Sequence, residues 1–411
     1  MQWIYNFFLR VVEFLFPVAA IFSTKIADFV KGRQGLFERL RTFAPDAERP
    51  VIWFHVASLG EYEQARPVMS LWKRRKPEVQ ILVSFFSPSG FAPISKRNEP
   101  VLDFITYLPL DRTSYAREFL DIVRPDIIYF VKYDLWFNFL MESSSRGIPL
   151  YLISASFRED QVYFRRKGFF RAPIFFFDHI FTQNEESDLL LEKIHYKSYT
   201  RVGDTRFDRV AETSGAPKRF PQIEAWLGEK PAVVLGSVWQ EDMDLLIPLI
   251  NQNKDFNWII APHSMNPGPM QNWKSQIKAS CQFYTSWDQT KTTEVLIIDT
   301  IGMLASLYQF AQVSYVGGAF GEGLHNILES IGFGAPVIFG KVRKAGKFPE
   351  AQESIKQGCG FEVEDFLALK TAFDSLKNPE NLERSRISAN SWVESNRGAT
   401  ERILDFTDNL Q

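Results

Sequence analysis

From residue 51 onward, the chain alternates short runs of β-branched and aromatic residues with longer segments of mixed polarity. This alternation is typical of parallel sheets covered by helices on both faces, because a strand buried on both sides reads as a short apolar run. The first half predicts strands at Val51–His55, Gln80–Phe86, Asp103–Leu108, Asp126–Val131, Leu150–Ser154, His179–Thr182 and Tyr199–Val202. The second half predicts strands at Ala232–Leu235, Trp258–Ala261, Val295–Asp299, Val313–Val316 and Pro336–Phe339.

A polar stretch containing proline and glycine, from about Ala211 to Lys230, separates the two sets of strands. A chain of 411 residues is too long for one ordinary core. We therefore predict two Rossmann-like domains, residues 31–212 and 213–411, that face each other across a cleft. Open α/β sheets bind ligands at the carboxyl ends of their strands, so the chemistry is expected there. A last helix, near residues 399–409, can cross back onto the first domain.

Charge and cysteine usage narrow the class of protein. The chain has 47 Lys and Arg against 49 Asp and Glu, a net charge of −2, so no global basic field indicates nucleic acid as a partner. Any anion site must be local. Cys281 and Cys359 are the only cysteines, too few for a disulfide framework or a cysteine zinc site, which favours a reducing compartment such as the cytoplasm.

The first thirty residues differ from the rest, because the run from Trp3 to Phe22 is almost entirely apolar. We interpret residues 1–30 as a membrane-contact helix that lies in the interface; a single span and a buried core helix remain alternatives. A signal peptide is disfavoured, since the charges fall inside the apolar run. Arg10 and Glu13 are spaced to pair on one helix face. A basic shelf for anionic head groups follows, formed by Lys25, Lys31, Arg33, Arg39 and Arg41.

The loop after the first strand carries the best candidate for acid–base chemistry. The segment from His55 to Glu61 opens a helix, and Gly60 is expected to let the backbone turn tightly while Ser58 faces the cleft. A carboxylate at the position of Glu61, in a partly desolvated cleft, suits a general base. The alternative is that Glu61 only stabilises the helix dipole. His55 is expected to be a wall residue.

Two glycine loops in the second half predict a phosphate site. Gly236 and Ser237 follow a strand and precede an acidic helix start. Asp242 and Asp244 match an Asp-x-Asp metal motif, but capping of that helix is the favoured interpretation.

The second loop, Gly317–Glu329, is the strongest local signal. Glycines such as Gly317, Gly318 and Gly323 let backbone amides approach a phosphate. Asn326 can donate to that phosphate, and Glu329, three residues later on the same face, can accept both hydroxyls of a ribose. The alternative is a glycine-lined turn capped by Asn326.

In order along the chain, these segments resemble the Kdo (3-deoxy-D-manno-octulosonic acid) transferases of lipopolysaccharide synthesis, glycosyltransferase family 30. The resemblance covers nearly the whole chain. It is carried by Gly32-Arg33-x-Gly35, His55 to Glu61, Tyr107-Leu-Pro-Leu-Asp111, Arg124-Pro125-Asp126, Asp134-Leu-Trp136-x-Asn138, Val202-Gly203-Asp-x-Arg206-Phe-Asp208, Gly236-Ser237 and the Gly317–Glu329 loop.

The resemblance implies a GT-B glycosyltransferase at the cytoplasmic face of the inner membrane. Such an enzyme moves Kdo from CMP-Kdo to a lipid A precursor, lipid IVA, with inversion and with Glu61 as the base; it holds no metal and no cofactor. Helix amides and nearby cations would then stabilise the departing phosphate. The implied donor-binding residues are Gly236, Ser237, His263, Gly317, Gly318, Gly323, His325, Asn326 and Glu329. The implied acceptor-binding residues are Arg33, Ser58, Gly60, Asp134 and Arg206.

Several positions depart from the family pattern on the expected donor and acceptor walls. Lys132 stands where the family has a glutamate, and the family's Pro-Arg-His is Pro262-His263-Ser264. Where the family has Asn-Ala-Arg, this chain has Ser154-Ala-Ser156. The positive charge that must hold the Kdo carboxylate is therefore expected on Lys132, Arg158 or Arg206.

Three other functions remain open from the sequence. One is a GT-B transferase that uses a UDP-sugar on undecaprenyl or another lipid acceptor. A second is a soluble nucleotide-sugar epimerase, which the apolar N-terminus argues against. A third is a membrane-bound nucleotide-binding scaffold, for which Glu61 would be dispensable.

Overall fold

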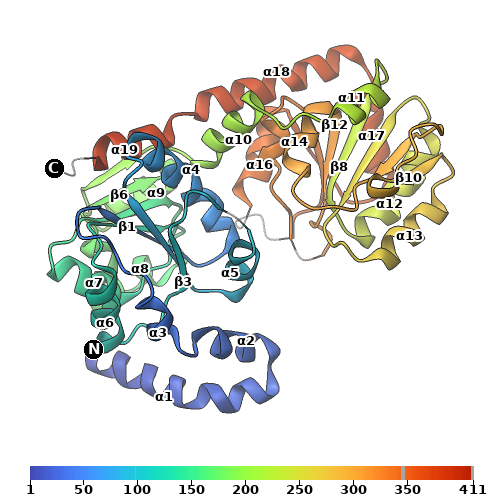
Figure 1. Ribbon diagram of the computed structural model, residues 1–411. Helices are drawn as coiled ribbons and strands as arrows, with labels where there is room; N and C mark the ends of the chain where they lie inside the picture. Colours follow the sequence, from blue (N-terminus) through green and yellow to red (C-terminus); the bar gives the residue numbers. More distant parts are fainter. Residues whose placement is uncertain (98, 322, 344–347, 409–411) are drawn as a thin grey trace. The chain divides into compact units, whose positions relative to one another are not determined.

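The computed structural model describes residues 1–97, 99–321, 323–343 and 348–408, and all structural statements below concern these residues (Figure 1). They form two compact units. The first contains Met1–Asp208 and Gly398–Gln411, and the second contains Arg209–Arg397. The division thus falls between Asp208 and Arg209, and the stretch 211–230 belongs to the second unit.

The first unit is built on a seven-stranded parallel sheet of order β3-β2-β1-β4-β5-β6-β7. Its strands are β1 (Val51–Val56), β2 (Gln80–Phe85), β3 (Phe104–Tyr107), β4 (Ile127–Val131), β5 (Leu150–Ala155), β6 (His179–Thr182) and β7 (Tyr199–Arg201). All seven predicted strands of the first half are confirmed, within one or two residues at each end. Because the order reverses between β1 and β4, a topological switch point lies there.

Both faces of this sheet are buried, which explains the apolar runs of its strands. Along β1, Val51 and Trp53 pack into one core cluster, while Ile52, Phe54 and Val56 pack into the other. Side chains of successive strand residues point to opposite faces, so a strand covered on both sides is apolar throughout. The observed burial confirms the predicted α/β architecture.

Helices cover the two faces of the first sheet and extend beyond its edges. They are α1 (Gln2–Phe22), α2 (Thr24–Arg33), α3 (Leu36–Leu40), α4 (Leu59–Arg75), α5 (Pro88–Ser95), α6 (Thr113–Val123), α7 (Phe137–Ser145), α8 (Val162–Arg165), α9 (Glu185–Lys193) and α19 (Ala399–Thr407), with short 3-10 turns η1 (Gly168–Phe170) and η2 (Ala172–Phe176). Helix α10 (Arg206–Gly215) spans the point of division.

The second unit has a second seven-stranded parallel sheet, of order β10-β11-β9-β8-β12-β13-β14. Its strands are β8 (Ala232–Val238), β9 (Asn257–Pro262), β10 (Cys281–Phe283), β11 (Val295–Ile297), β12 (Ala311–Val316), β13 (Val337–Gly340) and β14 (Gly360–Val363). The five predicted strands are confirmed. Strands β10 and β14 were not predicted, and they form the two edges. The order reverses between β8 and β12, which places a switch point there.

The remaining helices belong to the second unit. They are α11 (Pro221–Leu227), α12 (Gln240–Gln252), α13 (Pro267–Gln276), α14 (Leu304–Leu307), α15 (Leu328–Ile331), α16 (Pro349–Gln357), α17 (Phe366–Leu376) and α18 (Pro379–Asn396), with the 3-10 turns η3 (Tyr284–Ser286) and η4 (Tyr308–Phe310). Residues of α12, α13 and α17 share one core cluster with β8, β9 and β11.

Helix α1 is fixed to the first unit by polar bonds and exposes its apolar side chains to the surroundings. Tyr5 donates its hydroxyl to Asp111 at 2.8 Å, and Asn6 Oδ1 accepts from the backbone N–H of Thr113 at 3.2 Å. Glu13 pairs with Arg112 at 2.5 Å, so the expected Arg10–Glu13 pair is wrong. Asp111 is completely buried, and burial raises its pKa to about 7.

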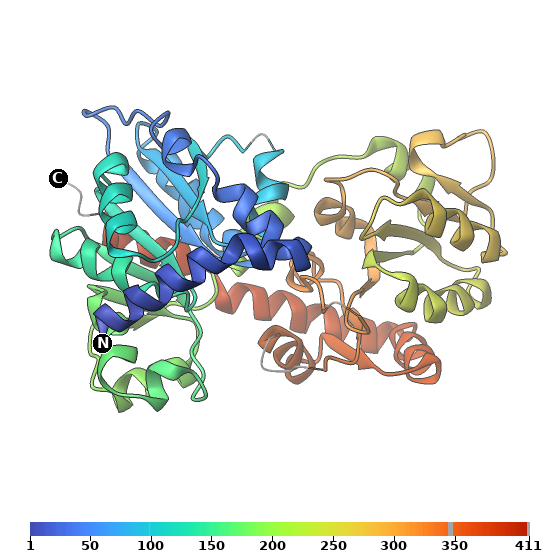
Figure 2. The same cartoon turned by 90° about the horizontal axis from the view of Figure 1, so that it is seen from below.

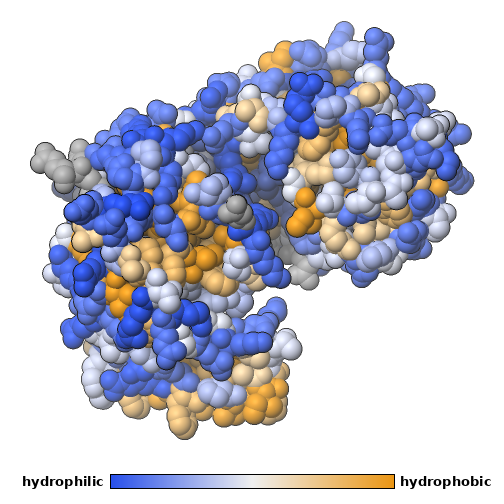
Figure 3. Space-filling view, viewed as in Figure 1, coloured by the Kyte–Doolittle hydropathy of each residue, from blue (hydrophilic) through white to orange (hydrophobic). Residues whose placement is uncertain are grey.

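The opposite face of α1 is an exposed apolar surface (Figure 3). Its exposed side chains are Trp3, Ile4, Phe7, Phe8, Val11, Phe14, Leu15, Val18, Ile21 and Phe22. The helix is long and apolar enough to cross a membrane by length and composition alone. Figure 2 shows α1 running along the first unit beside α2 and α3.

The C-terminal helix α19 returns to the first unit and packs against α4. Ala399, Ile403 and Leu404 are buried in the same core cluster as the inner side chains of β1. Asp208 accepts the backbone N–H groups of Gly398 at 2.5 Å and Thr400 at 2.7 Å, which caps this helix. Residue 409, at the end of the expected last helix, lies outside the described residues.

Candidate functional site

In the first unit, ionisable side chains gather at the carboxyl ends of β1 and β4. Glu61 lies in the loop and helix that follow β1, and Lys132 and Asp134 follow β4. Because these neighbouring strands flank the switch point, their ends lie together at one edge of the sheet. The structure therefore brings the predicted base and one predicted acceptor residue into one group.

Glu61 is the third residue of α4, and its carboxylate folds back over the start of the helix. Its Oε2 atom accepts the backbone N–H of Ala57 at 2.5 Å. The side chain is buried, with an exposed fraction of 7%. Burial and, to a lesser degree, the negative charge of Asp134 raise the pKa of Glu61 to about 8. Glu61 thus has both properties at once. The bond to the Ala57 N–H fits the helix-stabilising interpretation, and the raised pKa fits the general-base interpretation.

His55 and Asp134 form a hydrogen-bonded pair beside Glu61. The Nε2 atom of His55 lies 2.9 Å from Asp134 Oδ2, and Trp136 donates its indole N–H to the same oxygen at 2.9 Å. The other ring nitrogen of His55 lies 2.9 Å from the hydroxyl of Ser84 on β2. His55 is completely buried, as expected of a wall residue, and it holds Asp134 in place.

The backbone at the end of β4 is unusual. Lys132 has φ +68°, a left-handed conformation that residues with a side chain adopt at a cost. Such conformations persist where the surroundings enforce them, often at functional sites. Lys132 is close enough to Glu61 to lower the proton affinity of its carboxylate, opposing burial. Lys132 is therefore the cation of the three candidates that the structure places beside the base.

The other two candidate cations are engaged with acidic partners. Arg206 donates to Asp204 through Nε at 2.9 Å and through a terminal nitrogen at 2.7 Å. Arg158 lies 3.5 Å from Asp160 and stacks over the ring of Tyr133. The part of each in ligand binding stays a prediction.

Arg33 joins the helix α2 to the sheet instead of standing on an open basic shelf. Its guanidinium donates to the carbonyls of Leu108 at 2.9 Å and Phe86 at 2.7 Å, and it lies over the ring of Phe29. Burial lowers the pKa of Arg33 to about 9. Arg39 is likewise bonded to backbone carbonyls, and Arg41 pairs with Glu118. Arg33 is therefore not part of an open basic shelf, whereas Arg39 and Arg41 remain exposed and their part in such a shelf stays a prediction.

The expected tight turn at Gly60 is also wrong. Gly60 lies in the first turn of α4 without a positive φ, and a Cβ atom there would meet only the hydroxyl of Ser58 at 3.9 Å. The glycine that this loop requires is Gly90 on α5. A Cβ at Gly90 would lie 2.9 Å from the backbone nitrogen of Leu59 and 3.0 Å from the carbonyl carbon of Ser58. Sequence reasoning missed Gly90, since its contact is with a distant loop.

In the second unit, two glycine segments meet at the carboxyl ends of β8 and β12. Asp242 joins them: one oxygen accepts the backbone N–H of Trp239 at 2.9 Å and of Gly318 at 3.0 Å, and the other accepts the Tyr315 hydroxyl at 2.9 Å. The capping interpretation of Asp242 is confirmed, since its carboxylate accepts the backbone N–H of Trp239, the residue that precedes α12. Among the described residues, no group of three His, Cys, Asp or Glu is placed to hold a metal ion.

Close packing explains why glycine occupies these loops. A Cβ atom at Gly317 would lie 2.5 Å from Asp242 Oδ2 and 2.6 Å from the carbonyl oxygen of Ser237. Gly318 and Gly323 have φ +97° and +128°, conformations that favour glycine. Gly236, in the central strand β8, lies against the hydroxyl of Tyr308. A larger residue would collide with that hydroxyl.

The Asn326–Glu329 pair is confirmed, with Asn326 Nδ2 donating to Glu329 Oε1 at 3.3 Å. Helix α15, which begins at Leu328 after this loop, is only four residues long. Glu322, in the same loop by sequence, lies outside the described residues. Ser237 has φ +51°, a left-handed conformation directly after the core of β8.

Three aromatic rings stack beside these loops, one from the end of each of three neighbouring strands. They are Trp239 after β8, His263 after β9 and His325 after β12. The rings of Trp239 and His263 are 4.3 Å apart between centroids, and those of His263 and His325 are 4.4 Å apart. Sequence reasoning found both histidines but missed Trp239, whose ring stacks on His263.

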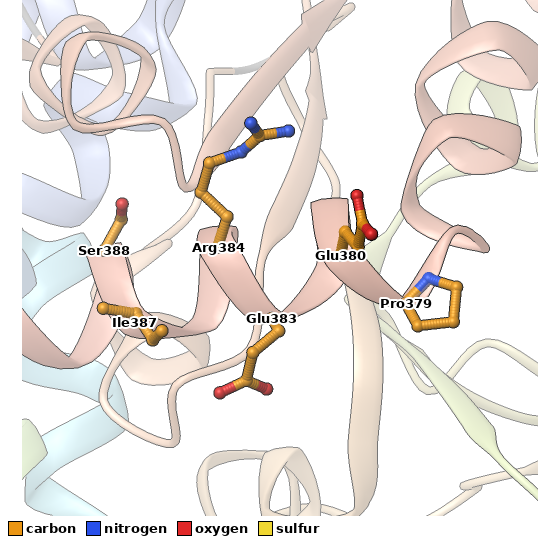
Figure 4. Close-up of a pocket in the computed structure, with 6 residues that line it drawn as sticks. All are labelled: Pro379, Glu380, Glu383, Arg384, Ile387 and Ser388. Atoms are coloured by element: carbon orange, nitrogen blue, oxygen red, sulfur yellow. The ribbon is translucent and has the colours of Figure 1, made fainter.

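Another surface hollow lies on α18 (Figure 4). Its lining consists of Pro379, Glu380, Glu383, Arg384, Ile387 and Ser388, all from one helix. None of these residues belongs to the two strand-end groups described above.

The sequence is similar to those of known transferases. The family model for 3-deoxy-D-manno-octulosonic-acid transferase (kdotransferase) matches residues 34–209. A 3-deoxy-D-manno-octulosonic acid transferase of Rickettsia felis is 26% identical over 374 residues, covering 87% of this chain and 78% of the relative.

Comparison with solved structures bears on the fold. MurG of Acinetobacter baumannii superposes with a TM-score of 0.58 at 12% identity, covering 88% of this chain and 100% of MurG. The UDP-GlcNAc 2-epimerase of Neisseria meningitidis bound to UDP-GlcNAc gives a TM-score of 0.59 at 14% identity, covering 86% and 98%. The chain therefore has the two-domain GT-B type of α/β fold, with an apolar N-terminal helix added.

Proposed function

We propose, from the premise that this chain is a member of the Kdo transferase family, that it moves Kdo from CMP-Kdo to lipid IVA, a lipid A precursor, with inversion. Glu61 acts as the general base. It takes the proton from an acceptor sugar hydroxyl, the freed oxygen attacks the anomeric carbon of Kdo, and the bond to the CMP oxygen breaks with its electrons leaving on CMP.

One observation carries the role of Glu61: a buried carboxylate with a pKa near 8 at the switch point of the first sheet. A base is most effective when its pKa lies near the working pH, and a carboxylate reaches that range only through burial and neighbouring negative charge. Asp134 supplies that negative charge and is itself held by His55 and Trp136. Lys132 is the cation nearest this group and is suited to the Kdo carboxylate.

The second unit binds the phosphate of the leaving CMP. The Gly317–Gly318 segment and the turn at Ser237 are fixed by Asp242, so backbone amides near them need no reorganisation during the reaction. Asn326 and Glu329 supply an amide donor and a carboxylate acceptor on one face for the nucleoside. The curated Rickettsia felis relative, a Kdo transferase by name, supports the donor class.

Helix α1 attaches the enzyme to the cytoplasmic face of the inner membrane by lying in the interface. Its polar residues Tyr5, Asn6 and Glu13 bond to the first unit, while Phe14 and Phe22 on the helix are 81% and 85% exposed. The polar bonds of residues 5–13 to the first unit support an interfacial position, because these bonded groups would lie in hydrocarbon if the helix spanned the bilayer. The acceptor's acyl chains lie in the same membrane.

The decisive experiment is to incubate the purified protein with lipid IVA and with CMP-Kdo generated in the reaction mixture. The mass of the lipid is then measured by mass spectrometry. A mass gain of one or more Kdo units is expected. Unchanged lipid, with tighter binding of UDP than of CMP in a parallel titration, would overturn the proposal in favour of a UDP-sugar enzyme.

Membrane attachment has its own test. Deletion of residues 1–22 should release the protein from inner-membrane vesicles. A full-length protein already found in the soluble fraction would contradict the interfacial role of α1.

A further inference from the structure

The stacked rings of Trp239, His263 and His325 contain a hydrogen bond whose direction is fixed. The indole Nε1 of Trp239 lies 3.1 Å from Nε2 of His325. An indole nitrogen can only donate, so Nε2 of His325 must be the acceptor and carries no proton. In a neutral imidazole the proton is then on Nδ1.

The surroundings of His325 oppose its protonation. A proton on Nε2 would point at the indole N–H and break the only bond that this nitrogen makes in the described structure. The ring of His263 is stacked on that of His325 at 4.4 Å, so a protonated His263 would repel a positive charge on His325. Burial and His263 lower the pKa of His325 to about 4.

Among the described residues, no acidic group raises the pKa of His325 against these effects. Asp242, the acid fixed at the adjoining loops, directs its oxygens to the backbone N–H groups of Trp239 and Gly318 and to the Tyr315 hydroxyl. His55 in the first unit differs, because its Nε2 faces the carboxylate of Asp134.

We infer that Trp239 is a positioning residue that holds His325 as the neutral Nδ1–H tautomer. His325 thereby serves the donor site as an uncharged N–H donor and never as a cation or a general acid. This inference rests on the proposed function for its ligand, a nucleoside monophosphate, but the state of the ring is a property of the protein alone.

The consequence concerns how the leaving group is bound. A neutral donor stabilises developing phosphate charge without drawing in a compensating proton. Binding of the nucleotide should therefore be insensitive to the titration of His325.

The test is nuclear magnetic resonance of the full chain labelled with ¹⁵N in histidine, without ligand. The protein has five histidines, so the spectrum is simple enough to assign His325 with a His325→Gln variant. We expect an Nδ1–H tautomer that resists protonation down to about pH 4.

The variant Trp239→Phe keeps a ring in the stack and removes the donor. We expect its tautomers to mix and its pKa to rise, while burial and His263 still hold that pKa below the ordinary imidazole value of about 6.5. Between pH 5 and 7, protonation of His325 should add nothing to the affinity for CMP in the native protein. In this variant the affinity should gain a pH dependence beyond that of the CMP phosphate itself, whose second pKa is about 6.

A matched control is Trp226→Phe, whose indole donates to the carbonyl of Thr293 away from this site. It should leave the His325 signals unchanged. An Nε2–H tautomer in the native protein, or a Trp239→Phe variant with native His325 signals, would overturn the inference. Native signals together with absent CMP binding would instead count against the proposed function only.

Discussion

The two units share one plan and differ in what they place at the switch point. Each has a seven-stranded parallel sheet whose order reverses beside its first strand, at β1 and β4 in one unit and at β8 and β12 in the other. In the first unit that edge carries ionisable side chains, Glu61, Lys132 and Asp134. In the second it carries glycine backbone and neutral rings. Each also has a tryptophan beside a histidine, but Trp136 donates to the carboxylate that His55 faces, whereas Trp239 donates to His325 itself.

The difference shows how one fold divides a reaction into two tasks. Proton transfer requires a group whose pKa is shifted toward neutrality, and buried side chains of mixed charge provide it. Holding a phosphate requires fixed amides and no side chain in the way, which glycine loops provide. The function proposed here assigns the acceptor to the first kind of site and the donor to the second.

The largest effect is expected when the base alone is removed. Glu61→Gln should reduce the transfer rate by roughly 10²–10⁴, because it removes general-base catalysis. CMP affinity should not change, since the donor loops lie in the other unit. Single-turnover kinetics and a CMP titration check both parts. Glu78→Gln, an exposed acid of the same unit, is the control; a Glu61→Gln enzyme within a few-fold of native would refute the assignment.

The reverse change disables the second unit. Gly317→Ala should weaken CMP binding by at least about tenfold and destabilise the protein by roughly 1–3 kcal/mol, because its Cβ would collide with Asp242 and Ser237. Gly321→Ala is the control in the same loop, since the nearest atom to its Cβ would be 3.9 Å away. Calorimetry measures both effects. Equal tolerance of the two alanines would show that the loop is not closely packed.

The pH dependence should separate the two sites. Glu61 acts as a base only when ionised, so the apparent kcat/KM should rise with pH and level off above about 8. CMP affinity should be nearly flat from pH 7 to 9, because the pKa of His325 is about 4. Rates and affinities measured over this range check the contrast. A rate that falls through pH 8 would contradict the role of Glu61 as base.

The smallest expected effect distinguishes two glycines near the base. Gly90→Ala should cost roughly 1–3 kcal/mol of stability, because its Cβ would strike the Ser58–Leu59 backbone. Gly60→Ala should be neutral or stabilise α4 by about 0.5–1 kcal/mol, since alanine is the better helix former. Chemical denaturation measures both. A costly Gly60→Ala with a tolerated Gly90→Ala would reverse the structural roles described here.

The sequence was sufficient for the whole first sheet and for the inner strands of the second, but not for the two edges of the second sheet. Central strands such as β1 and β9 are apolar throughout because both of their faces are buried. Strand β10 has only three half-buried residues, and β14 contains the exposed Glu362, so neither shows that pattern. Pairing with a neighbour already in the sheet defines both strands, and a single sequence does not reveal it.

The candidate site was predictable where one segment contains the chemistry, as in the loop that ends at Glu61. It was not predictable where the role depends on a distant partner. Arg33 is charged and follows the anchor, yet carbonyls of Phe86 and Leu108 take its donors. Trp239 resembles an ordinary core residue in sequence, and only the fold brings His263 and His325 to it.

The return of α19 to the first unit has a consequence for synthesis of the protein. A ribosome finishes the whole sheet of the first unit, and then the whole second unit, before it releases the residues that close the core around Ile403 and Leu404. Domains usually fold in the order in which they emerge. Here the core of the first unit stays incomplete beside α4 until α19 has been synthesised and packs against that helix.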